Sequence, residues 1–162
     1  MRIRTATQDD LDAICRVEAI CFPASEAGTR ESFAARLKVF PRHFLLLEDE
    51  GRLIGFVNGM VTDDRTISDV MFEQAELHKE DGKWQSVFGL DVLPEYRSKG
   101  YAGQLMRALI GHSREDGRCG CILTCKEHLL PYYTRFGFRN LGVSLSQHGG
   151  AVWYDMILEF SR

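Results

Sequence analysis

A strand, a basic glycine-containing turn and an amphipathic helix follow one another in the middle of the chain, and this unit limits the choice of folds more than any other segment. Residues Trp84–Val92 alternate as in a strand, which Pro94 ends. The turn lies at residues 97–100. The helix spans about 103–115, where apolar residues recur at three- and four-residue spacing. A strand that leads through a short turn into a helix predicts a fold that mixes the two element types.

The turn itself predicts a site for an anion. Free N–H groups and the helix dipole favour negative charge at a helix start. Gly100 lets the backbone approach a phosphate closely, and Arg97 and Lys99 add positive charge. The spacing matches neither a Walker loop nor a Gly-x-Gly-x-x-Gly fingerprint. A pyrophosphate is the guest that fits best, and an ordinary helix start with two surface cations is the alternative interpretation.

The other segments complete one mixed α/β domain. We expect no division of residues 1–162, because no linker, repeat or low-complexity segment interrupts them. Strands are predicted at 3–6, 44–47, 53–60, 84–92, 121–124, 138–145 and 152–159, and helices at 8–21, 30–40, 69–78, 103–115 and 127–136. Thr7 and Thr29 are the expected N-caps of the first two helices.

Composition excludes several classes of protein. The chain has 162 residues, with 20 basic and 23 acidic side chains and a formal net charge of −3, so the basic excess of a nucleic-acid binder is absent. No apolar run approaches the roughly 18 residues of a membrane helix. The start, Met1–Thr5, has no apolar signal segment. We therefore expect a cytoplasmic protein with neither nucleic-acid nor membrane partners.

The cysteines favour neither disulfides nor a metal. Their number is odd, no export signal precedes them, and the Cys-x-Cys pair fits no common zinc spacing. We expect five reduced thiols, mostly small buried side chains, and no metal site. They are Cys15, Cys21, Cys119, Cys121 and Cys125.

Three segments in order resemble the GCN5-related N-acetyltransferase (GNAT) family. Residues 97–102, Arg-Ser-Lys-Gly-Tyr-Ala, resemble the Arg/Gln-x-x-Gly-x-Gly/Ala loop that holds the pyrophosphate of acetyl-CoA in that family. Residues 130–138, Leu-Pro-Tyr-Tyr-Thr-Arg-Phe-Gly-Phe, are similar to its Tyr-x-x-x-Gly-Phe segment, and 51–59 to its third-strand hairpin. The resemblance covers about Ile3 to Glu159. It implies a GNAT fold, with a central, mostly antiparallel sheet that splays between its fourth and fifth strands and is flanked by helices.

Within the family, the chain most resembles the serotonin (arylalkylamine) N-acetyltransferases. Residues 129–138 and the loop Cys21–Thr29, which would cover the substrate, carry this likeness. Vertebrate members have two histidines on the fourth strand, which we match to Ser86 and Phe88 here. An imidazole relay at these two positions is therefore absent.

The resemblance also assigns the binding of acetyl-CoA, the expected co-substrate. The N–H of Leu90 would polarise the thioester, and the main chain of Leu90, Asp91 and Val92 would pair with the pantetheine arm. Asp91 itself should point to the other strand face, which makes its side chain structural. The pyrophosphate would be wrapped by Arg97, Ser98, Lys99, Gly100, Tyr101, Ala102 and Gly103.

Three side chains are candidates for catalysis. Transfer of an acyl group to an amine requires that the amine lose a proton and that the leaving thiolate gain one. The resemblance gives Tyr133 the second task, whereas its helical spacing alone would make it a core aromatic. Glu26 in the covering loop is the candidate base, although an exposed loop acid is the alternative. Ser86, expected on the face of Phe88 and Leu90, would position water.

Three functions remain open at this stage. The first is acetylation of a small primary amine, aromatic or polyamine, by direct transfer in a ternary complex. The second is a peptide or protein N-acetyltransferase, and the third a CoA-binding regulatory domain without catalysis. The acidic stretch 63–80 favours a cationic small amine. Similar proteins often form homodimers, so a homodimer is included among the expected partners.

Overall fold

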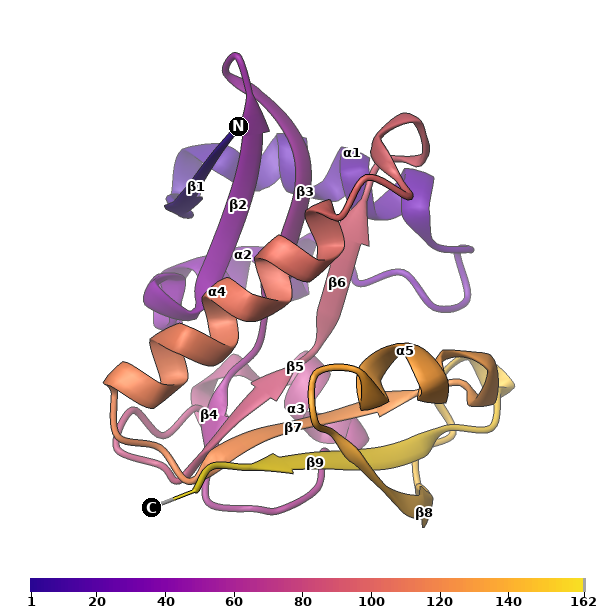
Figure 1. Cartoon of the computed structure of the whole chain (residues 1–162). Helices are drawn as coiled ribbons and strands as arrows, with labels where there is room; N and C mark the ends of the chain where they lie inside the picture. The colour runs from indigo at the N-terminus through magenta and orange to yellow at the C-terminus, as the bar shows by residue number, and fades with distance from the viewer. Residues whose placement is uncertain (162) are drawn as a thin grey trace.

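Two β-sheets form the frame of the molecule (Figure 1). Two chain segments, residues 52–62 and 84–92, bend so that each supplies one strand to each sheet. The computed structural model describes residues 1–161. The first sheet is antiparallel, in the order β1 (Arg2–Thr5), β2 (Phe44–Asp49), β3 (Arg52–Asn58) and β6 (Gly89–Val92). The second has the order β4 (Val61–Thr62), β5 (Trp84–Val87), β7 (Gly120–Cys125), β9 (Tyr154–Glu159) and β8 (Arg139–Val143). In it only β5 and β7 are parallel.

The predicted strand Trp84–Val92 is split between the two sheets. Two residues separate Asn58 from Val61, whereas three separate their partners Gln85 and Gly89. The extra residue is a bulge, and it shifts the alternation of side chains by one. The bulge lies at Phe88 and Gly89, because the N–H of Phe88 also donates to the carbonyl of Asn58, at 2.7 Å. The expectation that Ser86 shares a face with Leu90 is therefore wrong, whereas Phe88, before the shift, stays on the face of Trp84 and Ser86.

A close approach of two backbones makes the bend possible. A Cβ atom on Gly59 would lie 1.9 Å from the carbonyl oxygen of Ser86, a distance that no side chain tolerates. Only glycine allows the strands to cross so closely at this point. The result is that β5 pairs with β7, while β6 diverges from it, as the GNAT resemblance implied.

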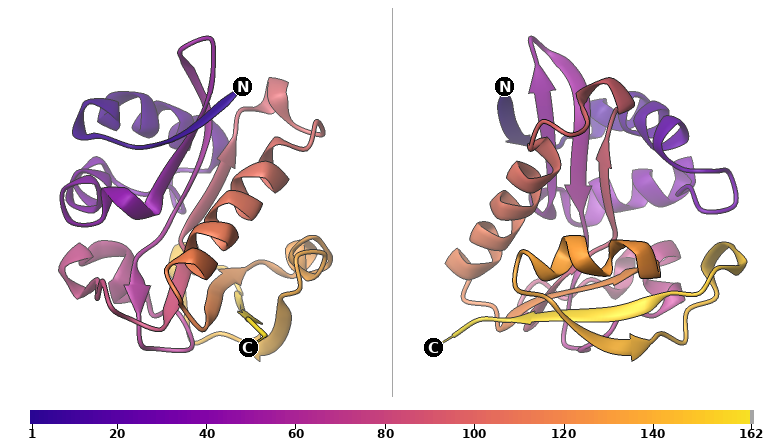
Figure 2. Two further views of the ribbon diagram at one scale, coloured as in Figure 1. Left: turned by 60° about the vertical axis from the view of Figure 1, so that its left-hand side comes forward. Right: turned by 45° about the vertical axis from the view of Figure 1, so that its right-hand side comes forward.

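Helices cover both faces of the first sheet (Figure 2). α1 (Leu11–Cys21) and α2 (Arg30–Val39) pack on one face, and α4 (Tyr101–Glu115) crosses the other face from β2 to β7. Thr29 caps α2, because its hydroxyl accepts from the N–H of Ser32 at 3.1 Å. Thr7 begins a 3-10 turn at Gln8–Asp10 that leads into α1.

The remaining helices are short and belong to the second sheet. α3 (Asp69–Glu73) and α5 (Leu130–Thr134) each have five residues, so the predicted helices at 69–78 and 127–136 are helical only in part. Single 3-10 turns flank them at Ala75–Leu77 and Glu127–Leu129. The predicted last hairpin is confirmed, since β8 and β9 pair antiparallel.

Apolar side chains fill the space between the layers. Phe33 of α2 meets Phe44 and Phe56 of the first sheet at ring-centroid distances of 6.1 and 5.9 Å. A smaller cluster around Phe40 and Trp84 lies under the second sheet. Among the residues that the structure describes, no helix has the length and apolar character needed to cross a membrane.

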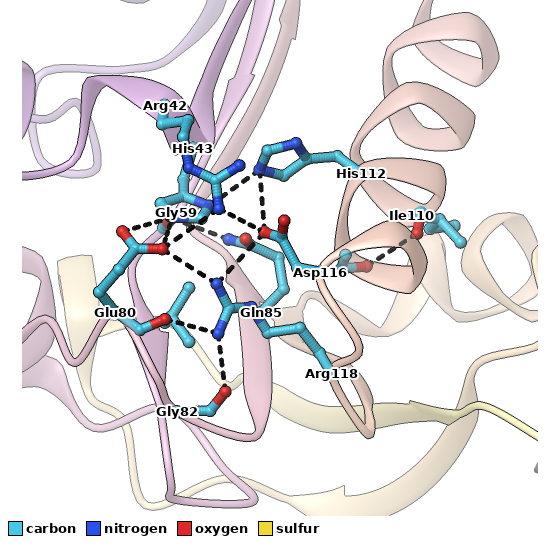
Figure 3. A network of polar contacts seen from close by, with 12 residues as sticks. Arg42, His43, Gly59, Glu80, Gly82, Gln85, Ile110, His112, Asp116 and Arg118 are labelled. Carbon is cyan, nitrogen blue, oxygen red and sulfur yellow. Dashed lines mark hydrogen bonds and ion pairs between the residues drawn. The ribbon is translucent and has the colours of Figure 1, made fainter.

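A polar network joins the two sheets at the C-terminal end of α4 (Figure 3). His43, next to β2, is fully buried and lies 3.0 Å from the Glu80 carboxylate and 3.1 Å from His112. Arg42 and Arg118 each contact both Glu80 and Asp116. The network therefore ties the start of β2 to the chain before β5 and to the end of α4.

Candidate functional site

A cavity of about 730 Å³ crosses the molecule where β6 diverges from β7. Its wall has two halves. On the side of α4 and α5 it is lined by Leu90, Val92, Arg97, Ala102, Cys125, Tyr132 and Tyr133. On the side of α1 and α2 it is lined by Glu18, Gly28, Phe33, Arg36, Asn58, Phe72 and Phe88. Because no strand fills the gap, one space connects the two faces of the first sheet.

The edge of β6 that faces this gap has main-chain groups that no neighbouring strand pairs with. The N–H of Leu93 donates to the carbonyl of Ile54 in β3 at 2.8 Å. In an antiparallel pair such contacts alternate, so the N–H and C=O of Leu90 and Val92 point to the other edge, into the gap. The Val92 carbonyl there accepts from Arg97 Nε at 2.9 Å. This edge could pair with an extended ligand as a neighbouring strand would.

The predicted anion turn lies on the surface at one end of the cavity. Residues 97–100 are exposed, and Gly100 is the N-cap of α4 with a φ of +85°. No side chain caps this helix, so the N–H groups of its first turn are open to a ligand. Sequence reasoning missed Arg107, whose guanidinium lies 3.2 Å from the position of a Cβ on Gly103. Arg107 adds a cation one helical turn into α4.

Tyr133 lines the cavity from α5. Its ring packs against Tyr132 and Phe138 at 5.2 and 6.2 Å between centroids. Burial raises the pKa of the Tyr133 phenol well above its ordinary value, and neighbouring Cys125 adds to this effect. The phenol is therefore protonated at neutral pH and can serve as a proton donor.

The structure places the other two catalytic candidates differently. Glu26 lines the cavity, but its carboxylate is held by Lys126 Nζ at 2.7 Å. Ser86 is fully buried outside the cavity wall, and its hydroxyl donates to the carbonyl of Met60 at 2.6 Å. The cavity thus brings together Tyr133, Glu26, Leu90 and the 97–103 turn, but not Ser86.

Two carboxyl groups that sequence reasoning did not assign to the site meet beside the cavity. Asp91 is 1% exposed, and its carboxyl faces that of Glu18 on α1 within hydrogen-bonding range. Burial first, and the negative charge of Glu18 second, raise the pKa of Asp91 well above its ordinary value. Two such groups hold one proton between them. The signal in the sequence is an acid on the apolar face of α1, between Val17 and Cys21.

A buried arginine organises this half of the cavity. Arg36 lies between the rings of Phe33 and Phe88, each with its centroid 5.0 Å from the guanidinium carbon. It donates to the side-chain oxygen of Asn58 at 3.1 Å and to the carbonyl of Phe72 at 3.0 Å. Burial lowers the pKa of Arg36 to about 10, so it remains a cation at neutral pH. It balances the one negative charge of the carboxyl pair.

The outer rim of the same half is acidic and aromatic. Asp69 and Glu73 of α3 line it, together with Phe72, His148 and Trp153. The rings of Phe72 and His148 stack at 5.7 Å. His148 Nε2 also lies 2.8 Å from the carbonyl oxygen of Glu26, which closes the rim between the Cys21–Thr29 loop and the chain before β9.

The network around His43 contains the only two groups in residues 1–161 whose geometry would suit a metal ion: His43 with His78 and Glu80, and His43 with His112 and Asp116. In the first group, the N–H of Val61 donates to His78 Nδ1 at 2.9 Å, which places the His78 proton on Nε2, where a metal would bind. In the second, both Arg42 and Arg118 already occupy Asp116 Oδ2, at 2.7 and 3.2 Å. The nitrogen and oxygen atoms that a metal would need already have partners within the protein, and we assign this network a structural role.

Comparisons with known proteins agree with this geometry. A sequence model described as the acetyltransferase (GNAT) family matches residues 11–138. The chain is 26% identical over 162 residues to the serotonin N-acetyltransferase of Mesocricetus auratus, covering 94% of this chain and 74% of that protein. A GphF GNAT-like decarboxylase in complex with isobutyryl-CoA superposes with a TM-score of 0.81 at 20% identity, over 98% of this chain and 99% of that chain. The ribosomal-protein-S18-alanine N-acetyltransferase of Escherichia coli gives 0.73 at 16%, over 99% and 94%.

Proposed function

Because the chain belongs to the GNAT family of acetyltransferases, we propose that it transfers the acetyl group of acetyl-CoA to a small primary amine within a ternary complex. One observation carries this proposal. A single cavity is lined by Arg97 and Ala102 of the 97–103 turn, by Tyr133, and by Glu18, whose carboxyl faces that of Asp91. A thioester and an amine that enter from opposite faces of the first sheet would meet at its centre.

Acetyl-CoA fits the half of the cavity next to α4. Its pyrophosphate would accept from the N–H groups at the start of α4, with Lys99 and Arg107 as counter-charges. Its pantetheine arm would pair with Leu90 and Val92 along the open edge of β6. Arg97 would then leave the Val92 carbonyl and turn to the phosphates, so that arm and pyrophosphate bind together.

The chemistry follows from the groups around the gap. A bound ammonium first loses one proton to solvent, because a protonated nitrogen has no lone pair. The neutral nitrogen then attacks the thioester carbonyl, and the N–H of Leu90 stabilises the negative oxygen that forms. The pair of Glu18 and Asp91, which holds one proton and one negative charge, accepts the proton that the attacking nitrogen then loses. As the C–S bond breaks, Tyr133 donates its phenolic proton to the sulfur. Solvent returns a proton from the carboxyl pair to Tyr133.

The half of the cavity on the side of α1 and α2, which we call the acceptor half, favours a cationic amine with an apolar or aromatic body. Four carboxyl groups line it, against two cations, Arg36 and the Lys126 that pairs with Glu26. They are Glu18, Glu26, Asp69 and Glu73. Negative potential attracts ammonium groups and raises their local concentration. Phe72, Phe88 and Trp153 provide apolar wall. An arylalkylamine satisfies both features, and a polyamine satisfies the first.

Two other functions remain second candidates. A peptide or protein acceptor would need an open groove, whereas Lys126 and His148 hold Glu26 across the rim. A CoA-binding regulatory domain would need no buried proton donor, whereas Tyr133 is positioned in the cavity. The closed rim and the buried phenol therefore support the small-amine proposal over these alternatives. We also propose that residues 1–162 act as one domain in the cytoplasm, as a homodimer.

The experiment is a thiol-release assay with acetyl-CoA and a panel of amines. The panel includes tryptamine, phenethylamine, spermidine and a peptide with a free N-terminus. We expect turnover on at least one small amine and slower turnover on the peptide. Binding of CoA without turnover on any amine would support the regulatory domain instead, and faster turnover on the peptide would support the second candidate.

A further inference from the structure

A niche over Gly89 borders the acceptor half of the cavity. A Cβ atom on Gly89 would lie 3.4 Å from Asp91 Oδ1 and 3.6 Å from Asn58 Nδ2. Gly89 and Asn58 both line the cavity, and the three residues lie on adjacent positions of β3 and β6. The missing side chain therefore leaves a space that has a hydrogen-bond acceptor on one side and a donor on the other.

Neither of these groups is fully paired within the protein. Asn58 and Asp91 are 0% and 1% exposed. Asn58 Nδ2 has no hydrogen-bond partner among residues 1–161, and the Asp91 carboxyl has none beyond the proton that it shares with Glu18. Buried polar groups in native proteins almost always have a partner, so unpaired ones call for an explanation. A ligand that brings its own donor and acceptor into the niche would pair both.

The orientation of the Asn58 amide is fixed by its neighbour. Arg36 donates to Asn58 Oδ1 at 3.1 Å, and a guanidinium has only donors to offer. The oxygen of the amide must therefore face Arg36, and the NH₂ group must face Gly89. Arg36 is itself held between two rings and the Phe72 carbonyl, so this arrangement is rigid.

We propose that the niche over Gly89 binds the head group of the acceptor, and that this acceptor is a primary amine with an oxygen on the second carbon from its nitrogen. Its ammonium or amine hydrogens pair with Asp91, and its oxygen accepts from Asn58 Nδ2. Amino alcohols and α-amino amides have this pattern, whereas a simple arylalkylamine has no oxygen for Asn58. A peptide N-terminus has it too, and there the contacts of Lys126 and His148 across the rim disfavour the longer body. The inference rests on the proposed acetyl transfer and specifies its substrate class.

The test compares acceptors that differ only in the head group. Tryptamine, tryptophanol and tryptophanamide share the indole body, and their kcat/KM values are measured with saturating acetyl-CoA. We expect kcat/KM to be at least about tenfold higher with the oxygen-bearing amines, because a site built around a polar group rejects the analogue that leaves it unpaired. Equal or higher kcat/KM for tryptamine would overturn the inference while leaving acetyl transfer intact. No turnover on any of the three, together with none on the wider panel, would overturn acetyl transfer itself.

Two variants localise the effect. Asn58→Leu removes the donor to the oxygen of the acceptor and also the contact with Arg36. The loss at Arg36 affects both acceptors alike, so the ratio of kcat/KM for tryptophanol to that for tryptamine should fall to about one. Gly89→Ala adds one methyl group at ordinary contact distances from its neighbours, so the fold should persist while the niche is filled. We expect Gly89→Ala to bind CoA and to lose turnover on all three acceptors. Gly111→Ala, at a glycine with open space around it, is the matched control. An unchanged ratio in Asn58→Leu, or full turnover in Gly89→Ala, would contradict the assignment of the niche.

Discussion

A carboxyl group that is buried against another carboxyl group destabilises a protein unless it keeps its proton. Asp91 meets this condition, because burial and the charge of Glu18 raise its pKa well above the ordinary value. The raised pKa stabilises the protein below the unfolded-state value, and this contribution is lost as the pH rises through the folded-state value. At pH 8 the pair therefore costs folding free energy, which indicates selection for something other than stability.

Replacement of Asp91 by asparagine should make the protein more stable at alkaline pH. The amide keeps the shape and donates to Glu18 without a charge. We expect the Tm of Asp91→Asn at pH 8 to exceed that of the wild type by about 2–4 °C for each kcal/mol regained. Differential scanning calorimetry at pH 8 and pH 5 measures this, and the difference should shrink at pH 5. A variant that is less stable than the wild type at both values would contradict the account of Asp91.

Removal of the Tyr133 hydroxyl should affect the chemical step more than binding. The phenol has a raised pKa and acts as a donor to the leaving thiolate in our proposal. We expect Tyr133→Phe to lower kcat by about 10²-fold with little change in the KM for acetyl-CoA, as is typical of a lost general acid. Tyr132→Phe, on the same helix, is the control and should keep most of the activity. If kcat of Tyr133→Phe equals that of the wild type, Tyr133 has no part in proton transfer.

For single residues, the sequence predicted the acetyl-CoA half of the cavity better than the acceptor half. The residues at 97–103 and Tyr133 belong to short local patterns, and Arg97, Ala102 and Tyr133 line the cavity. Glu18 and Asp91 are far apart in sequence, and only the packing of α1 against β6 brings them together. Ser86 was assigned from strict alternation, which a one-residue bulge shifts.

At the scale of elements, the central feature is a strand that changes sheets. The bulge between β5 and β6 and the close approach at Gly59 let the two halves diverge. The sequence predicts each strand from its alternation and its turns, but a bulge leaves no mark in that alternation until its partner strand is known. The short α5 shows a similar limit, because Pro131 and tertiary contacts decide where the helix begins.

Substitution of Gly100 tests whether the turn at the start of α4 binds the pyrophosphate. Its φ of +85° disfavours any side chain, and a Cβ there would face the predicted position of the pyrophosphate. Gly51 has a φ of +81° in the β2–β3 hairpin, and open space surrounds both glycines. We expect Gly100→Ala and Gly51→Ala to lose similar stability, about 1–2 kcal/mol. Only Gly100→Ala should raise the KM for acetyl-CoA, by about tenfold or more. Equal KM values in the two variants would show that the turn holds no phosphate.

At the scale of the whole molecule, the network around His43 fixes the angle between the sheets. Burial lowers the pKa of His43 to about 4, and hydrogen bonds from His78 and His43 outweigh burial and lower the pKa of Glu80 to about 2. A lowered histidine pKa gives stability that is complete above about 6.5 and is lost as the pH falls through 4. The contribution of Glu80 is complete above about 4.5 and is lost toward 2. Both losses act in the same direction on acidification.

The loss at His43 should show as a difference between the wild type and a His43 variant between pH 7 and pH 4. The opposing contribution of Asp91, which gains stability on acidification, is common to both proteins. His43→Gln, which cannot titrate, should begin with a lower Tm at pH 7, and its difference from the wild type should narrow toward pH 4. Circular dichroism melts at half-unit steps measure both slopes. Parallel curves for the two proteins would show that protonation of His43 does not open the network.

The binding of a conjugate of CoA and the amine tests the central claim, that one continuous cavity holds both substrates on opposite faces of the first sheet. The conjugate joins the CoA sulfur through an acetyl bridge to tryptophanol, and isothermal titration calorimetry measures its Kd against that of CoA alone. The account predicts that the conjugate binds at least about 10²-fold more tightly than CoA, as ligands that span both subsites do. It also predicts that Gly89→Ala loses most of this gain while its Kd for CoA stays the same. A conjugate that binds no better than CoA would contradict the account.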